Sequence, residues 1–124
     1  MRLLRLQAYV HLIVFDLYLA RGNFEALYKR VRLYPRNRRT SSEDNVKRIC
    51  DAVDMACIWY WKRALCLQQS AATACLLKQH GVQAQMVVGA QQIPFKAHAW
   101  VEVDGRVVND TPYMLEMYAV LDRF

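Results

Sequence analysis

Residues 95–110, FKAHAWVEVDGRVVND, predict a β-hairpin that carries two chemically active side chains. Two apolar-rich runs flank Asp104-Gly105, a dipeptide typical of tight hairpin turns. His98 lies on the first predicted strand, and Asp110 ends the second. Whether these two side chains meet depends on the type of turn between the strands.

Two turns are compatible with this hairpin. A two-residue type I′ turn at Asp104-Gly105 pairs Val103 with Arg106. In that register His98 and Asp110 lie on opposite faces of the hairpin. A three-residue loop shifts the pairing by one residue and sets His98 directly opposite Asp110. The positions of the valines favour neither register, so the residues leave the choice open, whereas a catalytic pair requires the three-residue loop.

Three helices are predicted upstream of the hairpin. The first spans residues 6–31, with a loosening at 21–23, and ends before Pro35, which cannot continue a helix. The second opens at a capping box formed by Thr40 and Glu43. Its apolar stripe at helical spacing comprises Val46, Ile49, Cys50, Val53, Cys57, Tyr60 and Trp61. The third spans residues 66–80 and ends at Gly81, a residue suited to the left-handed conformation that terminates helices.

A small sheet is predicted after the helices. Residues 82–89 alternate between apolar and polar positions, as in a half-buried strand, and residues 90–95 are predicted as a loop. The order predicts an α+β fold with one domain over residues 1–124. Its helical N-terminal part, residues 1–65, packs on a small antiparallel sheet, and residues 66–124 supply the third helix and that sheet.

Composition and charge narrow the possible partners. The chain has 124 residues and a net charge of +6, and the positive charge concentrates in residues 28–39, YKRVRLYPRNRR. This run predicts either a solvated loop after a helix or a docking surface for an acidic protein or peptide. Nucleic acid is not expected, because no aromatic residues are interleaved at stacking spacing and no helix-turn-helix or RNP pattern is present.

The cysteines and the N-terminus indicate the cellular setting. The four cysteines form no CxxC pair and no Cys/His cluster at zinc spacing, so neither a metal nor another cofactor is expected. Three of them fall on apolar helix faces, which is typical of the reducing cytosol, and a cytoplasmic location is expected. His11 and Asp16 interrupt the apolar N-terminal segment, which is therefore predicted as an amphipathic helix docked on the domain and not as a signal peptide or a membrane span.

Cys66 is the cysteine best placed to act as a nucleophile, because it starts the third predicted helix. A helix N-terminus offers partial positive charge and free N–H groups that stabilise a thiolate and a developing oxyanion. A Cys, then His98 and then Asp110 is the order of papain-like and transglutaminase-like folds, although these residue types also occur together by chance. Tyr60 or Trp61 could add an oxyanion donor, but core packing is expected for both.

Residues 66–110 resemble the core of the lasso peptide B2 proteins, which are leader peptidases with a transglutaminase-like fold. The resemblance rests on CL followed by S at the helix start, on the HG helix end, and on VVGAQ, PF.AHAWVE and the final ND. The intervals between Cys66, His98 and Asp110 also fit the family's order. Residues 1–65 resemble the family only in their apolar, Arg-bearing helical character.

The resemblance implies that Cys66 is the nucleophile, His98 the general base and then acid, and Asp110 the residue that orients it. The implied activity is a cysteine peptidase of the stand-alone form that removes the leader peptide from a lasso peptide precursor through an acyl-enzyme, before an ATP-dependent cyclase closes the macrolactam.

The resemblance also implies partners. They are the precursor's leader, a separate B1 leader-recognition protein and the macrolactam-forming cyclase. The B1 protein would dock on the N-terminal helix or the basic segment. Neither nucleic acid nor a membrane is an expected partner. Two alternatives to the peptidase stay open: a catalytically inactive peptide-binding or scaffold module with the same fold, and an amine acyltransferase.

Overall fold

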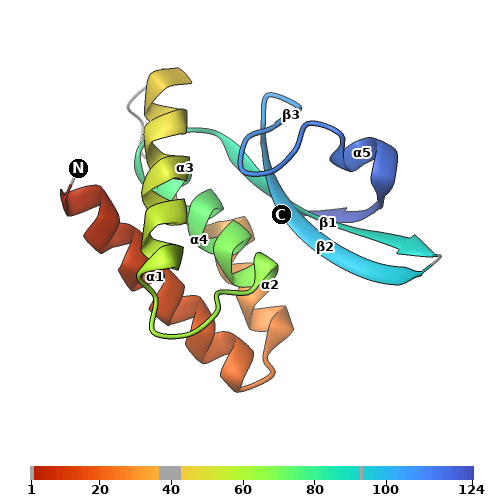
Figure 1. Cartoon of the computed structure of the whole chain (residues 1–124), viewed down its shortest axis with the longest axis horizontal. Helices are drawn as coiled ribbons and strands as arrows, with labels where there is room; N and C mark the ends of the chain where they lie inside the picture. The colour runs from red at the N-terminus through yellow and green to blue at the C-terminus, as the bar shows by residue number, and fades with distance from the viewer. Residues whose placement is uncertain (1, 37–42, 93) are drawn as a thin grey trace.

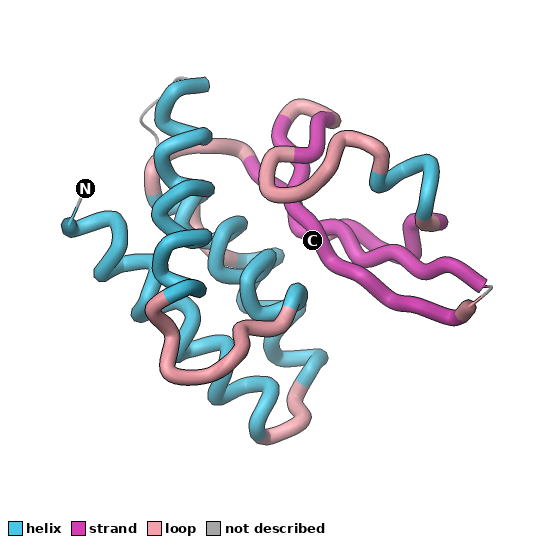
Figure 2. Tube along the Cα trace, in the orientation of Figure 1, coloured by secondary structure: helices cyan, strands magenta, loops and turns pink. Residues whose placement is uncertain are grey.

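The computed structural model describes residues 2–36, 43–92 and 94–124. Figure 1 shows the larger helices on one side of the molecule: α1 (Arg2–Ala20), α2 (Phe24–Leu33), α3 (Glu43–Ile58) and α4 (Cys66–Gln79). The other side holds β1 (Ala84–Gln92), β2 (Phe95–Val103), β3 (Arg106–Val107) and β4 (Ala119–Arg123), with the one-turn helix α5 (Met114–Met117) before β4. The separation of helices from strands in Figure 2 confirms the predicted α+β fold.

The first predicted helix is in fact two helices, and the break falls where the loosening was expected. Gly22 has a φ of +66°, a left-handed conformation that ends α1. Asn23 then caps α2, because its side-chain oxygen accepts a hydrogen bond from the Ala26 amide at 3.2 Å. α2 ends at Leu33, before Pro35, as the sequence predicts. α1 begins earlier than expected, at Arg2.

α4 lies at the centre of the helical half. Most of its side chains are buried, and α1 contributes Ala8, Leu12 and Phe15 to the same core. α3 adds Ile49 and Val53 from the predicted apolar stripe. The exposed end of α4 is its first turn, and the helix ends before Gly81, whose φ of +86° confirms the predicted terminator.

Two predictions for the second helix, its capping box and the burial of Trp61, are not confirmed. Thr40, half of the proposed capping box, lies outside the described residues. Trp61 does not belong to the apolar stripe, since its side chain is 72% exposed. The reason is that α3 ends at Ile58, so helical spacing no longer determines which way Trp61 points. Tyr60, in contrast, is buried as predicted.

α1 has a second apolar face that the core does not cover. This outer face comprises five exposed residues at alternating spacings of three and four: Leu3, Leu6, Val10, Ile13 and Leu17. Because both of its faces are apolar, α1 is long and apolar enough to cross a membrane when length and composition alone are considered. It is the one helix among the described residues that meets this criterion. Core helices of soluble proteins meet the same criterion, and the inner face of α1 is part of the core.

The described part of the basic segment packs against the domain. Residues 28–33 belong to α2, and residues 37–39 lie outside the described residues. Arg32 lies 3.6 Å from Asp122, and Arg36 donates a hydrogen bond to the Gly81 carbonyl at 3.1 Å. The described part of this segment is therefore not the solvated loop that the sequence allowed.

The sheet is antiparallel, with strand order β3-β2-β1-β4. β1 and β2 form a long hairpin that is paired as far as Gln92 and Phe95. The prediction of a loop over residues 90–95 is therefore wrong: residues 90–92 continue β1, because the ladder with β2 outweighs their weak strand character. Val101 and Val103 of β2 face the helical core, whereas Trp100 packs with Val87 and Met114 on the other face.

Candidate active site

Cys66 is the first residue of α4, and it is the exposed member of the four cysteines. Leu65 precedes it in an extended conformation, and the Gln68 side chain accepts a hydrogen bond from the Leu65 amide at 3.3 Å. The Gln68 amide group in turn donates to the Leu12 carbonyl at 2.7 Å, which anchors the helix start to α1. A thiol in this position faces solvent at a helix N-terminus, where the helix dipole favours negative charge.

The other three cysteines are in the opposite situation. Burial raises the pKa of Cys50 to about 12, and the nearby Asp54 and Asp51 carboxylates act in the same direction. Burial and Asp54 raise the pKa of Cys57 to about 11, and burial raises that of Cys75 to about 12. These thiols are therefore poor nucleophiles at neutral pH, as expected for small core side chains.

His98 and Asp110 meet. The His98 Nε2 atom lies 2.6 Å from Asp110 Oδ2, and each side chain is about a quarter exposed, at 26% and 27%. The other carboxylate oxygen of Asp110 accepts a hydrogen bond from the Thr111 amide at 2.7 Å. With Nε2 directed at the carboxylate, Nδ1 is the ring nitrogen left for a nucleophile.

Two aromatic rings pack against the imidazole of His98. Its ring centroid lies 5.5 Å from that of Tyr118 and 6.3 Å from that of Trp100, both in roughly stacked orientation. The Trp100 indole is buried and donates a hydrogen bond to the buried Glu102 carboxylate at 3.0 Å. A fixed neighbour of this kind limits the rotation of the histidine ring.

His98 and Asp110 meet even though the hairpin has the register in which the sequence predicted them to lie on opposite faces. Val103 pairs with Arg106, and the two turn residues have positive φ angles, +53° for Asp104 and +76° for Gly105. This is the two-residue type I′ turn, so the three-residue loop required by the catalytic hypothesis is wrong. His98 reaches Asp110 because the chain leaves the ladder after two residues of β3 and bends back toward β2.

The two side chains considered as oxyanion donors, Tyr60 and Trp61, make other interactions. The Tyr60 hydroxyl donates a hydrogen bond to Asp16 Oδ2 at 2.7 Å, and burial together with that carboxylate raises the pKa of Tyr60 to about 12. Its proton is thereby committed to Asp16. Trp61 is exposed and stacks against the Lys62 ammonium group, 4.9 Å from its ring centroid. The backbone amide of Cys66 is the remaining candidate named from the sequence.

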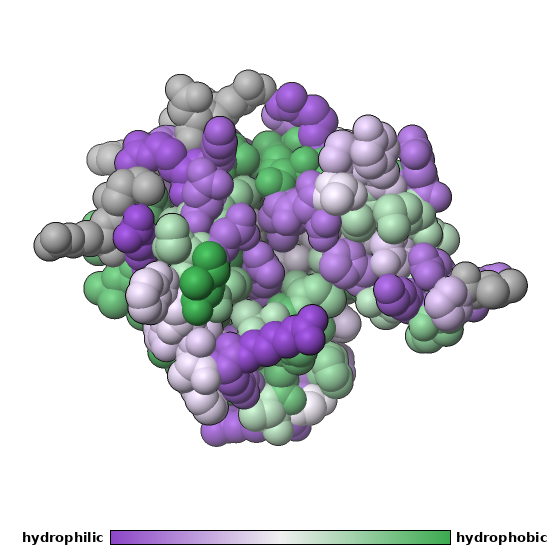
Figure 3. Space-filling view, viewed as in Figure 1, coloured by the Kyte–Doolittle hydropathy of each residue, from purple (hydrophilic) through white to green (hydrophobic). Residues whose placement is uncertain are grey.

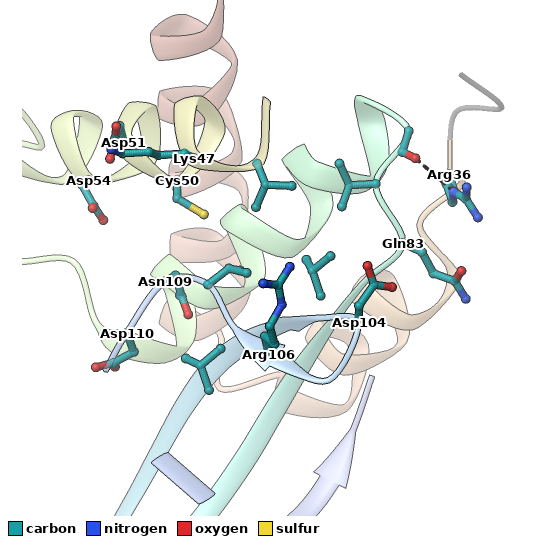
Figure 4. Close-up of a pocket in the computed structure, with 16 residues that line it drawn as sticks. Arg36, Lys47, Cys50, Asp51, Asp54, Gln83, Asp104, Arg106, Asn109 and Asp110 are labelled. Carbon is teal, nitrogen blue, oxygen red and sulfur yellow. Dashed lines mark hydrogen bonds between the residues drawn. The ribbon is translucent and has the colours of Figure 1, made fainter. Parts of the chain in front are cut away.

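Figure 4 shows a groove that begins beside Asp110 and runs between α3 and the β2–β3 turn. Its volume is about 750 Å³, which is in the range of ligand-binding clefts. Asp51 and Asp54 line one wall, Arg106 lies on the other, and several valines form its apolar part. Hydrophilic side chains also gather where the helical half meets the sheet in Figure 3. The described residues contain no group of three His, Cys, Asp or Glu side chains arranged to hold a metal.

The structure thus joins two of the three predicted site residues directly. Cys66 makes no hydrogen bond to His98 in the described part of the chain, but its helix contacts the strand of the histidine. Ser70, four residues after Cys66 and therefore on the same face of α4, donates a hydrogen bond to the carbonyl of Ala99, the neighbour of His98, at 3.0 Å. Sequence reasoning missed Ser70, although it lies in the quoted CL…S stretch.

Comparison with known proteins identifies the family of the chain. The family model described as transglutaminase-like superfamily matches residues 11–123. The Microcin J25-processing protein McjB of Escherichia coli is 39% identical over 56 residues, a match that covers 45% of this chain and 27% of that protein's length. No solved structure matches the chain. The transglutaminase-like family expected from the sequence is confirmed, and a microcin J25-processing protein is similar to part of the chain.

Proposed function

Because the chain belongs to the transglutaminase-like superfamily, we propose that it is a cysteine peptidase that removes the leader peptide from a lasso peptide precursor. The observation that carries this proposal is the His98–Asp110 hydrogen bond, because His98 lies on β2 and β2 contacts α4, the helix that begins at the exposed Cys66. The similarity to a microcin J25-processing protein supports a precursor peptide as the substrate. The chain spans about a quarter of that relative, so its activity is carried over here as a proposal only.

The proposed reaction has two halves, and the first forms an acyl-enzyme on Cys66. His98 Nδ1 accepts the proton of the Cys66 thiol, and the sulfur attacks the carbonyl carbon of the scissile peptide bond. The Cys66 amide and the start of α4 stabilise the oxyanion. The C–N bond then breaks, His98 gives its proton to the leaving amine, and the leader stays on Cys66 as a thioester.

Water completes the turnover. His98 accepts a proton from the water molecule, the hydroxide attacks the thioester, and the leader leaves with a carboxylate while Cys66 recovers its thiol. The Asp110 carboxylate holds the imidazole ring in one tautomer and stabilises its protonated form in both steps. The core peptide released in the first step carries a new amino group, which is the group that a macrolactam-forming cyclase needs.

The groove beside Asp110 supports an extended peptide as substrate. Its valines offer contacts for apolar side chains, and its charged walls offer partners for polar ones. Asp54 is partly buried there, and burial together with the neighbouring Asp51 raises the pKa of its carboxyl group. The Gln69 side chain donates a hydrogen bond to Asp54 at 2.8 Å, which links this wall to the first turns of α4 near Cys66.

The outer face of α1 supports a partner protein. Five exposed apolar residues at three- and four-residue spacings form a continuous stripe, the pattern by which one helix packs on another. We assign this stripe to the B1 leader-recognition protein, which would bring the leader to the site. The positive net charge of +6 would favour association with an acidic partner surface.

The proposal is tested by mixing the full chain with the precursor peptide and the B1 protein and analysing the products by mass spectrometry. We expect two fragments whose masses sum to the precursor plus one water, and no fragments with Cys66→Ala. Precursor binding without cleavage by the wild-type chain would support the inactive binding module instead. Loss of ammonia with crosslinked product would support an amine acyltransferase, and either result would contradict the peptidase.

A further inference from the structure

The His98–Asp110 contact needs an explanation, because the β2–β3 ladder by itself would separate the two residues. In an antiparallel ladder, Val101 and Val108 would exchange both of their backbone hydrogen bonds in this register. Only one is made: the Val108 amide donates to the Val101 carbonyl at 3.0 Å. The Val101 amide instead donates to the side-chain oxygen of Asn109, at 2.7 Å. Asn109 thus replaces a backbone carbonyl and ends the ladder one residue before Asp110.

The other end of the Asn109 side chain reaches the nucleophile's helix. Its Nδ2 group donates a hydrogen bond to Ser70 Oγ at 3.3 Å, and Ser70 Oγ donates its own proton to the Ala99 carbonyl at 3.0 Å. Ser70 is 1% exposed, so its hydroxyl group depends on these partners. The bonding pattern also determines the orientation of the amide, because the Val101 N–H requires an acceptor and only the oxygen of Asn109 is one.

We propose that Asn109 and Ser70 are positioning residues for the catalytic machinery. Asn109 bends the chain so that Asp110 meets His98, and Ser70 ties this bend and the residue after His98 to α4 at one turn from Cys66. The inference rests on the proposed peptidase function for its kinetic consequence. Its structural consequence, the formation of the His98–Asp110 hydrogen bond, is independent of that function.

The chemistry of the network determines the test variants. Asn109→Leu keeps the approximate size of the side chain and removes both the acceptor for Val101 and the donor to Ser70. Ser70→Ala removes the link to Ala99, whereas Ser70→Thr keeps the hydroxyl group and is the conservative rescue. Thr73→Val is the matched control, because Thr73 is a buried hydroxyl residue of the same helix whose hydrogen bond stays within it, to the Gln69 carbonyl at 2.8 Å.

The first measurement is the NMR signal of the His98 ring proton. In the wild type, an N–H proton held between His98 and Asp110 should resonate downfield of the amide region, assigned by its loss in His98→Ala. We expect Asn109→Leu and Ser70→Ala to lose or broaden this signal while the dispersed methyl signals of the core persist. Thr73→Val and Ser70→Thr should keep it. A sharp, unshifted ring signal in both Asn109→Leu and Ser70→Ala would overturn the inference.

The second measurement is the kinetics of precursor cleavage. Misplacement of the catalytic groups should lower kcat by about 100-fold in Asn109→Leu. In Ser70→Ala the fall in kcat should come with little change in KM, because Ser70 does not line the groove. If the wild-type chain does not cleave any precursor, the proposed function fails, while the NMR comparison still decides the positioning role. If Asn109→Leu does not fold, Ser70→Ala and its Thr rescue decide it, and equal kcat values for Ser70→Ala and Thr73→Val would overturn the inference.

Discussion

Gly89 of β1 lies directly across the ladder from His98 of β2, and the side chain of Trp100 fills the space where a Cβ atom would be. A Cβ atom added to Gly89 would come within 2.6 Å of the indole ring and 3.0 Å of the Tyr118 Cβ atom. These are the two aromatic residues that contact the His98 ring. The absence of a side chain at Gly89 therefore allows the aromatic packing around the His98 ring.

Replacement of Gly89 by Ala should accordingly damage both stability and cleavage. The indole ring has to move by several tenths of an ångström, and overpacking of this kind costs about 1–3 kcal/mol of unfolding free energy. Urea unfolding and precursor cleavage measure the two effects. The cost should be smaller when Gly89→Ala is made in a Trp100→Phe background, because phenylalanine lacks the two ring atoms that a Cβ atom would meet. Equal costs in both backgrounds would contradict the packing argument.

Alkylation should distinguish Cys66 from the other cysteines. At pH 7, iodoacetamide should modify Cys66 first, because it is exposed at a helix N-terminus while burial raises the pKa of Cys50, Cys57 and Cys75 to about 11 or 12. Peptide mapping at successive times gives the order of reaction. Cys66→Ala should remove the fast phase and leave the slow ones. Equal rates at Cys57 and Cys66 would count against the assignment of the nucleophile.

Substitution of Asp110 should separate charge from hydrogen bonding. Asp110→Ala removes the acceptor for His98, and we expect kcat to fall by about 100- to 10,000-fold, as for other orienting carboxylates. Asp110→Asn keeps an oxygen acceptor without the charge and should fall between this variant and the wild type. Far-UV circular dichroism should show the same fold for all three proteins. Wild-type cleavage by Asp110→Ala would remove Asp110 from the mechanism.

His11 should make the stability depend on pH. Burial lowers the pKa of this histidine, and the Arg30 guanidinium acts in the same direction, although a hydrogen bond to the Gln79 side chain at 3.0 Å opposes them. The unfolded chain then binds a proton more readily than the folded chain, so the stabilisation is present above the unfolded pKa of about 6.5 and is lost as the pH falls below it.

The measurement is the free energy of unfolding at pH 7 and pH 5 for the wild type and His11→Gln. The difference between the two pH values should be smaller in the variant, which has no imidazole to protonate. Burial acts to raise the pKa of Asp16, but its hydrogen bonds to Lys62 and Tyr60 together with the Lys62 charge lower that pKa below its ordinary value. Asp16 therefore remains charged over this interval and should not contribute. An unchanged pH dependence in His11→Gln would show that His11 is protonated equally in both states.

Charged substitutions on the outer face of α1 should weaken binding of the B1 protein without affecting the stability of the chain. Leu6→Asp and Val10→Asp introduce carboxylates at exposed positions, so the melting temperature should hardly change. Affinity for the B1 protein, measured by calorimetry, should fall by about tenfold or more. Leu33→Asp is the matched control, because Leu33 is as exposed as Leu3, at 65%, but lies on α2. Equal losses for Leu6→Asp and Leu33→Asp would contradict a docking role for this face.

The sequence alone determines those features that depend on neighbouring residues. Cys66 opens a helix because the residues after it are good helix formers with an apolar pattern, and Gly81 ends that helix because a glycine adopts positive φ at little cost. The Asp104-Gly105 pair likewise predicts a hairpin, and the order of Cys66, His98 and Asp110 indicates the family. Each of these inferences uses local conformational preference or spacing along the chain.

The tertiary structure decided how the site is assembled. The register of the hairpin would separate His98 from Asp110, and it is the bonds from Asn109 to Val101 and to Ser70 that bring them together. Ser70 lies 39 residues from Asn109, and Tyr60 lies 44 residues from the Asp16 carboxylate that engages its hydroxyl group. A side chain that replaces a backbone hydrogen bond leaves no periodic signal in a sequence, because its partner is determined by the packing of a distant helix against the strand.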